Sequence, residues 1–584
     1  MRKITQLGYM FLVMVVLVNV VFPVEIHAAA IKEQFHVTKH VHYKDTEYTQ
    51  SKTKQRVRVL QINTGDPNTF VDLGLAPSLG ALQRTTDMAN RYQKEGYYVL
   101  GAINGSFFYN YGPNYQRGMP MNLIAVYNRL IQAGEVFDSK KNYVNEPIAF
   151  GRNAQGKYMI DHFDLTLTYT HQGNKYNITA SNKEREANQT IIYTSDFPKN
   201  TTQTNEWGIE VVVTLPEKPV MEFGTSVVGE VTAVRERGQK QTVAIPENGF
   251  VLSGHGTGAK GLENVKVGDS ITLDIHIDQK WKDSAFMLAS GPLLVKDGKV
   301  NLTMDPKSDN ARIRAPRTAI AIDRSGTRVY FVTVDGRQSG YSTGMSLTEF
   351  ANHLVSLGVD RALNLDGGGS TAMAVRYPGK SKISLVNRPS DGRERGVPSV
   401  LMAVSKVAPT PFSDLLETHW AYDAVKRLYD KGTITGFPDG TFKPDHQIKR
   451  SHVALMFARE FNLDTKNAPD PGFKDVKKTD PEYGAIAAVA HAGLFEGRGS
   501  GIFGKDDSLT RAEMATVIQR AYQIGSAKKP ANFSDIKGHW AYDAINAIAE
   551  VNITQGYEDG TFRPDRHVTR AEFSQFLINS SHLK

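Results

Sequence analysis

The segment ALNLDGGGSTAM, residues 362–373, restricts the fold more than any other stretch, because an apolar run ends at Asp366 and three glycines follow. The spacing of GGGSTA satisfies the G-x-G-x-x-A pattern of dinucleotide-binding folds, which need a helix directly after the glycines. The following residues MAVRYPGKSK alternate briefly and then reach Pro378 and Gly379, which end any helix. A Walker loop is excluded too, since the Gly-Lys-Ser/Thr ending is missing. The segment therefore predicts a strand followed by a glycine turn.

The residues before this turn predict a helix and a strand. Ser346 and Glu349 form a capping box, the apolar residues of 347–357 mark one helical face, and Gly358 ends the helix. A strand ending at Asp366 follows. Glycine amides can approach an oxyanion closely, so the turn is either an anion site with Asp366 at its edge or a purely structural turn.

Other polar residues also follow or precede predicted strands, and sites are usually built at such places. Asn104 follows the apolar strand YYVLGAI, and the segment APRTAIAIDRSGTRVYFVTVDGR predicts two alternating strands flanked by Arg317 and Asp335. Asp391 and Arg395 precede the final strand, VPSVLMAV. We expect these residues to gather around the glycine turn.

Taken in order, the motifs NGSFF, GPLLVKDGK, PRTAIAID, VDGR, LNLDGGGSTAM and PSDGRER…VPS resemble the phosphodiester glycosidase family over about residues 55–406. Animal members of that family remove N-acetylglucosamine from a mannose 6-phosphate diester. The resemblance implies an α+β catalytic region of mixed sheets with helices, acting on a sugar 1-phosphodiester.

Cleavage of the C1–O bond of such a diester releases a phosphomonoester, whose second pKa is only about 6, so a general acid matters little. A carboxylate and donors for the phosphate are still needed. Asp366 is the first candidate for the carboxylate and Asp335 for a second acid, whereas Arg317 and Arg395 would clamp the phosphate bidentately. Further candidate substrate-binding residues are Asn104, Gly367, Gly368, Gly369, Ser370, Thr371 and Asp391.

Each candidate also has a structural reading, in which Arg317, Asp335 and Arg395 only form ion pairs at strand ends, and Arg388 and Arg393 are solvated loop charges. No His or Cys grouping has metal-ligand spacing, so no metal site and no cofactor is indicated. The sequence leaves open a divalent cation held by Asp366, Asp335 or Asp391.

The C-terminal third of the chain contains three repeats. FSD at Phe412, FKD at Phe473 and FSD at Phe533 recur at spacings of 61 and 60 residues. The stretches from His419 to Asp445 and from His539 to Asp565 match almost residue for residue, with apolar residues at helical spacing. A second helix begins at TRAE, residues 510–513 and 569–572, where threonine and glutamate form a capping box.

An arginine in the first turn of a helix is unfavourable unless it binds an anion there. With HWA, GxxDGTFxPD and TRAE, the repeats resemble S-layer homology domains, which fold as a compact, all-α-dominated helical triplet and bind a pyruvylated secondary cell-wall polysaccharide. The resemblance implies that Arg450, Arg511 and Arg570 bind its carboxylates, with Trp420 and Trp540 beside the sugar. The first repeat departs from the pattern with KRSH and the second lacks HWA, so one or two grooves are expected to be weak.

These patterns predict a multidomain chain. The expected parts are a signal peptide at 1–30, a catalytic region at 31–406 with a β-rich part at about 161–278, and repeats at 410–467, 471–526 and 531–584. Arg2 and Lys3 precede the apolar run of residues 10–24, and Ala28–Ala30 suits a signal peptidase; a retained membrane anchor is the alternative. No later segment is apolar enough to span a bilayer.

The composition bears on location and partners. The chain has no cysteine, which is typical of exported proteins of Gram-positive bacteria, and its net charge of +8 suits an acidic wall polymer. No basic stripe with interleaved aromatics occurs, which argues against nucleic acid. We therefore expect a secreted, wall-anchored glycosidase that acts on a phosphate-bearing glycan. The alternatives are a phosphodiesterase that cleaves P–O and a non-catalytic wall-binding protein of the S-layer.

Overall fold

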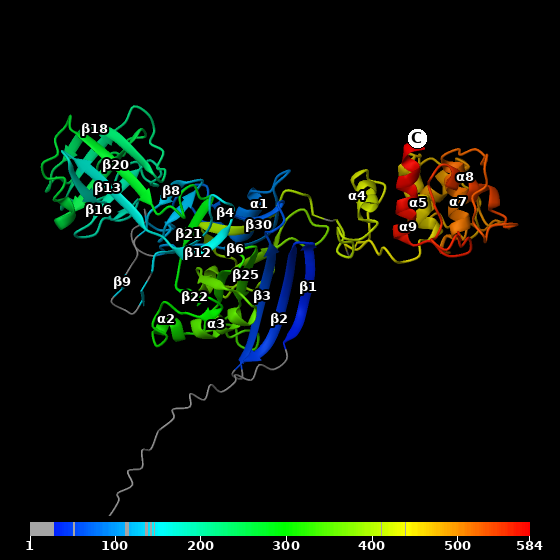
Figure 1. Cartoon of the computed structure of the whole chain (residues 1–584), viewed down its shortest axis with the longest axis horizontal. Coiled ribbons are helices and arrows are strands. Elements are labelled where there is room, and N and C mark those ends of the chain that lie inside the picture. Colours follow the sequence, from blue (N-terminus) through cyan, green and yellow to red (C-terminus); the bar gives the residue numbers. More distant parts are fainter. Residues whose placement is uncertain are drawn as a thin grey trace, which may run out of the picture.

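The computed structural model describes residues 29–50, 53–110, 116–134, 138–139, 143–144, 146–409, 411–438 and 440–583. The signal-peptide prediction falls almost entirely outside them. Figure 1 shows a β-rich part at one end of the molecule, a second group of sheets in the middle, and a helical part at the other end. Among the described residues no helix is both long and apolar enough to cross a membrane.

The central part contains an eight-stranded antiparallel sheet. Its strand order is β1 (Ala30–Thr38), β2 (Val41–Gln50), β3 (Thr53–Asn63), β25 (Arg328–Val334), β24 (Arg317–Ile322), β26 (Arg361–Asn364), β22 (Leu293–Lys296) and β23 (Lys299–Val300). Helix α3 (Leu347–Ser356) begins with the predicted capping box and packs its apolar face on this sheet, together with the short helix α2 (Asp309–Arg312). The predicted helix and both strands of residues 315–337 are confirmed.

A five-stranded sheet packs against the other face of the first sheet. Its order is β28 (Ser384–Leu385), β27 (Met373–Val375), β6 (Tyr98–Asn104), β30 (Ser399–Ser405) and β4 (Thr69–Leu75), and α1 (Thr85–Arg91) lies beside it. One hydrophobic core joins the two sheets, with Leu60 and Ile320 from the first and Ile103 and Leu401 from the second. The chain crosses between the sheets from β26 to β27, and the glycine turn is that crossing.

Two further large sheets and two two-stranded ones complete the N-terminal region, the small sheets being β9 (Asp138–Ser139) with β10 (Tyr143–Val144) and β5 (Gln83–Arg84) with β29 (Gly396–Val397). The five-stranded one contains β12 (Tyr158–His162), β11 (Ile148–Arg152), β21 (Phe286–Ala289), β7 (Ile124–Val126) and β8 (Arg129–Gln132). The eight-stranded one contains β14 (Asn174–Asn177), β13 (Leu165–His171), β20 (Ser270–Ile277), β18 (Thr225–Arg235), β17 (Gly208–Thr214), β19 (Gly249–His255), β16 (Thr190–Thr194) and β15 (Ala180–Ser181). Within the described residues, the only parallel strand pair is β15 with β16.

The C-terminal part is built from pairs of helices around one shared core. The helices are α4 (Tyr422–Asp430), α5 (Arg450–Glu460), α6 (Tyr483–His491), α7 (Arg511–Ala521), α8 (Tyr542–Glu550) and α9 (Arg570–Ser580). The predicted capping boxes of α7 and α9 are both present. The expectation of a multidomain chain with a β-rich N-terminal region is confirmed, and helices α4–α9 occupy the C-terminal region.

Candidate active site and wall-binding residues

The glycine turn is held by backbone partners from two other segments. Asp366 N donates to Gly105 O at 3.2 Å, and Asn104 Nδ2 donates to Asp366 O at 2.6 Å. Gly368 N donates to Pro316 O at 2.9 Å. After a single 3-10 turn, Gly368–Ser370, the chain enters β27, which confirms that no long helix follows the glycines.

At two positions of the turn, 368 and 369, backbone conformation or close packing favours glycine over any residue with a side chain. Gly368 has a φ of +59°, a conformation that side chains rarely tolerate. A Cβ on Gly369 would collide with the Arg395 guanidinium and the Asp391 carboxylate. The absence of a side chain at these glycines therefore lets the turn backbone lie directly against charged side chains.

Asp366 is a half-buried residue at the edge of this turn. Burial raises its pKa to about 6, whereas a hydrogen bond with Ser370, the charge of Arg395 and the amide of Gly367 act in the opposite direction. A carboxyl group with this pKa is largely ionised at neutral pH and still basic enough to accept a proton. This is the behaviour expected of a nucleophile or a general base.

Two arginines lie close to the turn. Arg395 pairs with Asp391 at 2.6 Å, and its Nη1 donates to Ser370 Oγ at 3.4 Å. The Arg337 guanidinium lies against Gly368, and no carboxylate among the described residues forms an ion pair with it. Arg337 was missed from the sequence, although it belongs to the VDGR motif, because an arginine in a turn is usually solvated.

Arg317, the other predicted phosphate ligand, contacts backbone carbonyls. Its Nε donates to Met345 O at 2.9 Å and its Nη2 donates to Ile313 O at 2.6 Å. Burial, with a contribution from the charge of Arg337, lowers the Arg317 pKa to about 10. Arg317 therefore adds positive potential near the turn without a carboxylate partner in the described part of the chain.

The Asn104 side chain is fully buried and bonded within the protein. Its Oδ1 accepts from Thr318 Oγ1 at 2.9 Å and from Ala372 N at 3.1 Å, while its Nδ2 holds Asp366 O. Thr371 is buried beside it and accepts from Thr318 Oγ1 at 3.3 Å. These contacts fix the position of the turn, so Asn104 and Thr371 stabilise the backbone that carries Asp366.

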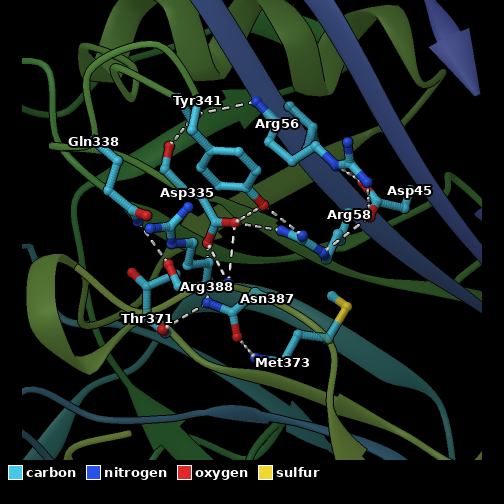
Figure 2. A network of polar contacts seen from close by, with 12 residues as sticks. Asp45, Arg56, Arg58, Asp335, Gln338, Tyr341, Thr371, Met373, Asn387 and Arg388 are labelled. Carbon is cyan, nitrogen blue, oxygen red and sulfur yellow. Dashed lines mark hydrogen bonds and ion pairs between the residues drawn. The ribbon is translucent and has the colours of Figure 1, made fainter. Parts of the chain in front are cut away.

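Asp335 lies at the centre of a buried network, shown in Figure 2. Arg58 Nη1 contacts its Oδ2 at 2.5 Å, Tyr341 OH donates to the same oxygen at 3.0 Å, and Asn387 Nδ2 donates to Oδ1 at 3.0 Å. The backbone amide of Arg388 adds bonds of 3.2 and 3.1 Å. With both oxygens occupied, Asp335 has a strong structural function, and its use as a second acid stays a prediction.

Asn387 connects this network to the glycine turn (Figure 2). Its Nδ2 also donates to Thr371 O at 3.0 Å, and its Oδ1 accepts from Met373 N at 2.8 Å. Nothing in the sequence marked Asn387, because its partners are either distant or backbone atoms.

A cavity of about 640 Å³ lies between residues 75–80, residues 195–200 and Pro398, and Asp366 does not line it. The next residue, Ser399, holds Gly105 N through its carbonyl and Ser106 N through its hydroxyl, both at 2.9 Å. The cavity therefore adjoins the segment that supports Asp366. Within the described ranges, no group of three or more His, Cys, Asp or Glu side chains could hold a metal ion.

The predicted wall-binding residues separate into two kinds. Arg450, Arg511 and Arg570 are the first residues of α5, α7 and α9, and their side chains are buried against aromatic rings. Trp420 and Trp540 are 60% and 66% exposed. A guanidinium matches a carboxylate through two hydrogen bonds, so these positions suit an anionic ligand, and the binding of an acidic sugar by these residues stays a prediction.

Comparison with known families agrees with this organisation. Residues 223–404 match the family described as phosphodiester glycosidase, and residues 411–454, 472–515 and 532–574 match the S-layer homology domain. The chain thus carries a phosphodiester glycosidase domain followed by three S-layer homology domains, a type found in proteins attached to the cell surface. The first match begins well after residue 55, so Asn104 lies outside it.

Related proteins share only part of the chain. An S-layer protein of Bacillus licheniformis is 34% identical over 186 residues, 31% of this chain and 20% of that protein. An uncharacterized cell wall amidase of Bacillus anthracis is 36% identical over 171 residues, 28% of this chain and 31% of that protein. The chain thus spans less than a third of either relative. A hypothetical protein from Synechocystis has the same fold, with a TM-score of 0.50, 21% identity and coverage of 63% of this chain and 62% of that one.

We predict that Asp335→Asn lowers the free energy of unfolding by about 3 kcal/mol or more, because it leaves the buried charge of Arg58 without its closest partner. Asp391→Asn is the matched control, since its ion pair with Arg395 is more than a third exposed and should contribute about 1 kcal/mol or less. Urea unfolding of both full-length variants measures the difference. Equal losses would contradict a structural function for Asp335.

Proposed function

We propose that the N-terminal region hydrolyses a glycosyl phosphodiester, such as an N-acetylglucosamine 1-phosphodiester, in a phosphate-bearing glycan or wall polymer. The observation that carries this proposal is the position of Asp366. Its carboxylate lies at the edge of a glycine turn, next to Ser370 and within the electrostatic influence of Arg395, and the Arg337 guanidinium lies against Gly368 of the same turn. A carboxylate beside two guanidinium groups suits a substrate that joins a sugar carbon to a phosphate.

In the proposed reaction, the C1–O bond breaks and the phosphomonoester leaves with the bonding electrons. Asp366 either attacks C1, with water later hydrolysing the glycosyl ester, or takes a proton from the water that attacks. Arg395 and Arg337 offset the charge that develops on the phosphate oxygens. The products are a free sugar and a phosphomonoester, and one water molecule is consumed.

A phosphodiesterase would use the same cations but break the P–O bond. Hydrolysis in oxygen-18 water distinguishes the two reactions. Label in the sugar hydroxyl supports glycosidic cleavage, whereas label in the phosphate would overturn it. The non-enzymatic alternative is a wall-binding protein of the S-layer, for which no glycosyl phosphodiester would turn over.

Asp366→Asn should lower kcat/KM by at least about 10²-fold to 10⁴-fold, because an amide can neither attack C1 nor accept the proton of water. Release of sugar from N-acetylglucosamine 1-phosphodiesters measures the loss, and circular dichroism checks the fold. The control is Asp297→Asn, which changes an exposed carboxylate in the turn after β22. Unchanged turnover in Asp366→Asn would rule out this carboxylate.

The pH profile should follow the titration of Asp366. Its pKa is raised to about 6, so the reactive ionised form is lost as the pH falls below 6. We expect kcat/KM to fall about tenfold per pH unit well below 6 and to level off above it. Arg395→Gln should move the midpoint upward, because the arginine charge stabilises the carboxylate. A profile that stays level from pH 5 to 7 would contradict this role.

We further propose that the three S-layer homology domains hold the protein on the cell wall through an acidic, pyruvylated secondary polysaccharide. The observation that supports this is the burial of Arg511 and Arg570, 4% and 8% exposed, without an ion pair to a carboxylate in the described part of the chain. A buried cation of this kind costs free energy unless an anion joins it. The protein would then be secreted and retained at a Gram-positive type of wall.

The double variant Arg511→Ala with Arg570→Ala should sediment with purified cell walls at least about tenfold less than the wild type, because two buried anion-binding groups are lost. Arg324→Ala with Arg328→Ala removes the same charge from two exposed residues, one in the turn after β24 and one at the start of β25, and serves as the control. Equal sedimentation of the two double variants would contradict these arginines as the wall contacts.

A further inference from the structure

The three S-layer homology units close into a ring through equivalent arginines. Each arginine donates its Nε to a phenylalanine carbonyl of another unit. The bonds are Arg450 to Phe503 at 2.9 Å, Arg511 to Phe562 at 2.7 Å and Arg570 to Phe442 at 2.7 Å. Each guanidinium also lies over the aromatic rings of that other unit, within 4.4–5.4 Å of a ring centroid. We name the three grooves after their arginines.

The residue two positions after each arginine differs among the repeats. It is Glu513 in the second unit and Glu572 in the third, but His452 in the first. The ring places each of these side chains beside the arginine of the preceding unit: Glu513 beside Arg450, Glu572 near Arg511 and His452 beside Arg570. The charge that each arginine faces is therefore set by the neighbouring repeat.

The Arg450 groove already contains a carboxylate. Arg450 Nη1 contacts Glu513 Oε1 at 3.1 Å, and the same oxygen contacts Arg498 at 2.9 Å. Arg450 Nη2 donates to Glu496 O at 2.9 Å. All three guanidinium nitrogens of Arg450 thus have partners in the protein, and an incoming anion would have to displace Glu513 and then lie close to its charge.

In the Arg511 groove the equivalent carboxylate, that of Glu572, pairs with another arginine and not with Arg511. Glu572 Oε1 contacts Arg566 at 2.5 Å, and Arg563 pairs with Asp559 at 2.9 Å. Arg511 therefore keeps only the Phe562 carbonyl as a hydrogen-bond partner within the described residues. Arg511 thus has no carboxylate partner in the described part of the chain, but the charge of Glu572 still acts on it from nearby.

The Arg570 groove contains no carboxylate paired with its arginine in the described part of the chain. Arg570 Nη1 lies 3.4 Å from His452 Nδ1, and because a guanidinium only donates, this nitrogen must be unprotonated. Both residues line a cavity of about 140 Å³, together with Phe437 and Arg459. His452 thus places a neutral ring where the equivalent positions of the other two repeats have a glutamate, and it does so in a groove that contains a cavity.

We infer that the Arg570 groove is the principal site for the carboxylate of the wall polymer, that His452 is the residue that makes it receptive, and that Glu513 closes the Arg450 groove from within. This inference rests on the proposed anchoring function. It also gives a physical reason for the departure of the first repeat from the TRAE pattern, since the histidine of KRSH serves the arginine of the third repeat.

The test is calorimetric binding of a synthetic hexoside that carries a pyruvate ketal to the full-length protein. His452→Glu should weaken binding at least about tenfold, because it places a carboxylate against Arg570 as in the Arg450 groove. His452→Gln, which is neutral, should stay within about threefold of the wild type. Circular dichroism and the unfolding midpoint check that both variants fold.

Glu513→Gln tests the closed groove, and we expect it to add one binding site per chain. Equal affinity of His452→Glu and the wild type would overturn the assignment of the Arg570 groove, and an unchanged stoichiometry in Glu513→Gln would overturn the closure. If the wild type binds neither this hexoside nor acidic wall polymer, the anchoring function itself fails. If the wild type and His452→Glu bind with equal affinity, only the present inference is refuted and the anchoring function stands.

Discussion

The ion pair between Arg58 and Asp335 is the contact on which the candidate active site depends. Both side chains are at most 4% exposed, and removing two charges from water costs several kcal/mol per ion unless the remaining donors and acceptors are satisfied. Here Tyr341, Asn387 and the Arg388 amide supply hydrogen bonds, and Asp45 adds a second carboxylate 3.3 Å from Arg58 Nε, which itself has no hydrogen-bond partner among the described residues. The network therefore joins β3 and the end of β25 to the segment that follows β28, and through Asn387 it reaches the glycine turn.

The glycine turn is the place where the chain crosses from one sheet to the other, and contacts with other segments of the chain fix its position. Asn104, Gly105 and Pro316 hold its backbone, while Gly369 allows Arg395 and Asp391 to approach. As a result Asp366 is held partly away from water, beside Ser370, Arg395 and the Gly367 amide. This arrangement raises its pKa and lowers the stability of the ionised form, a cost that is common where a carboxyl group has to react.

The C-terminal part uses one residue for two purposes. Each repeat arginine closes the ring of units through its Nε, and its other two nitrogens contact Glu513 and Glu496 O in Arg450 but no carboxylate among the described residues in Arg511 and Arg570. Because the closing contact is the same in all three units, the grooves differ only in the side chains that surround the free nitrogens. Small sequence changes between repeats can then alter anion affinity without altering the fold, since the aromatic and carbonyl contacts stay in place.

The amino-acid sequence by itself determined the local structure: the capping boxes of α3, α7 and α9, the strands before Asn104 and Asp335, the three repeats and the absence of a long helix after Gly369. These features depend on residues within a few positions of one another, so they can be predicted from the amino-acid sequence. Only the tertiary structure decided that Asp335 pairs with Arg58, 277 positions away, that Arg337 lies against Gly368, and that Glu513 contacts Arg450 whereas Glu572 contacts Arg566. The physical reason is that a charged side chain takes the partner that packing brings within reach, and packing depends on contacts between segments far apart in the sequence.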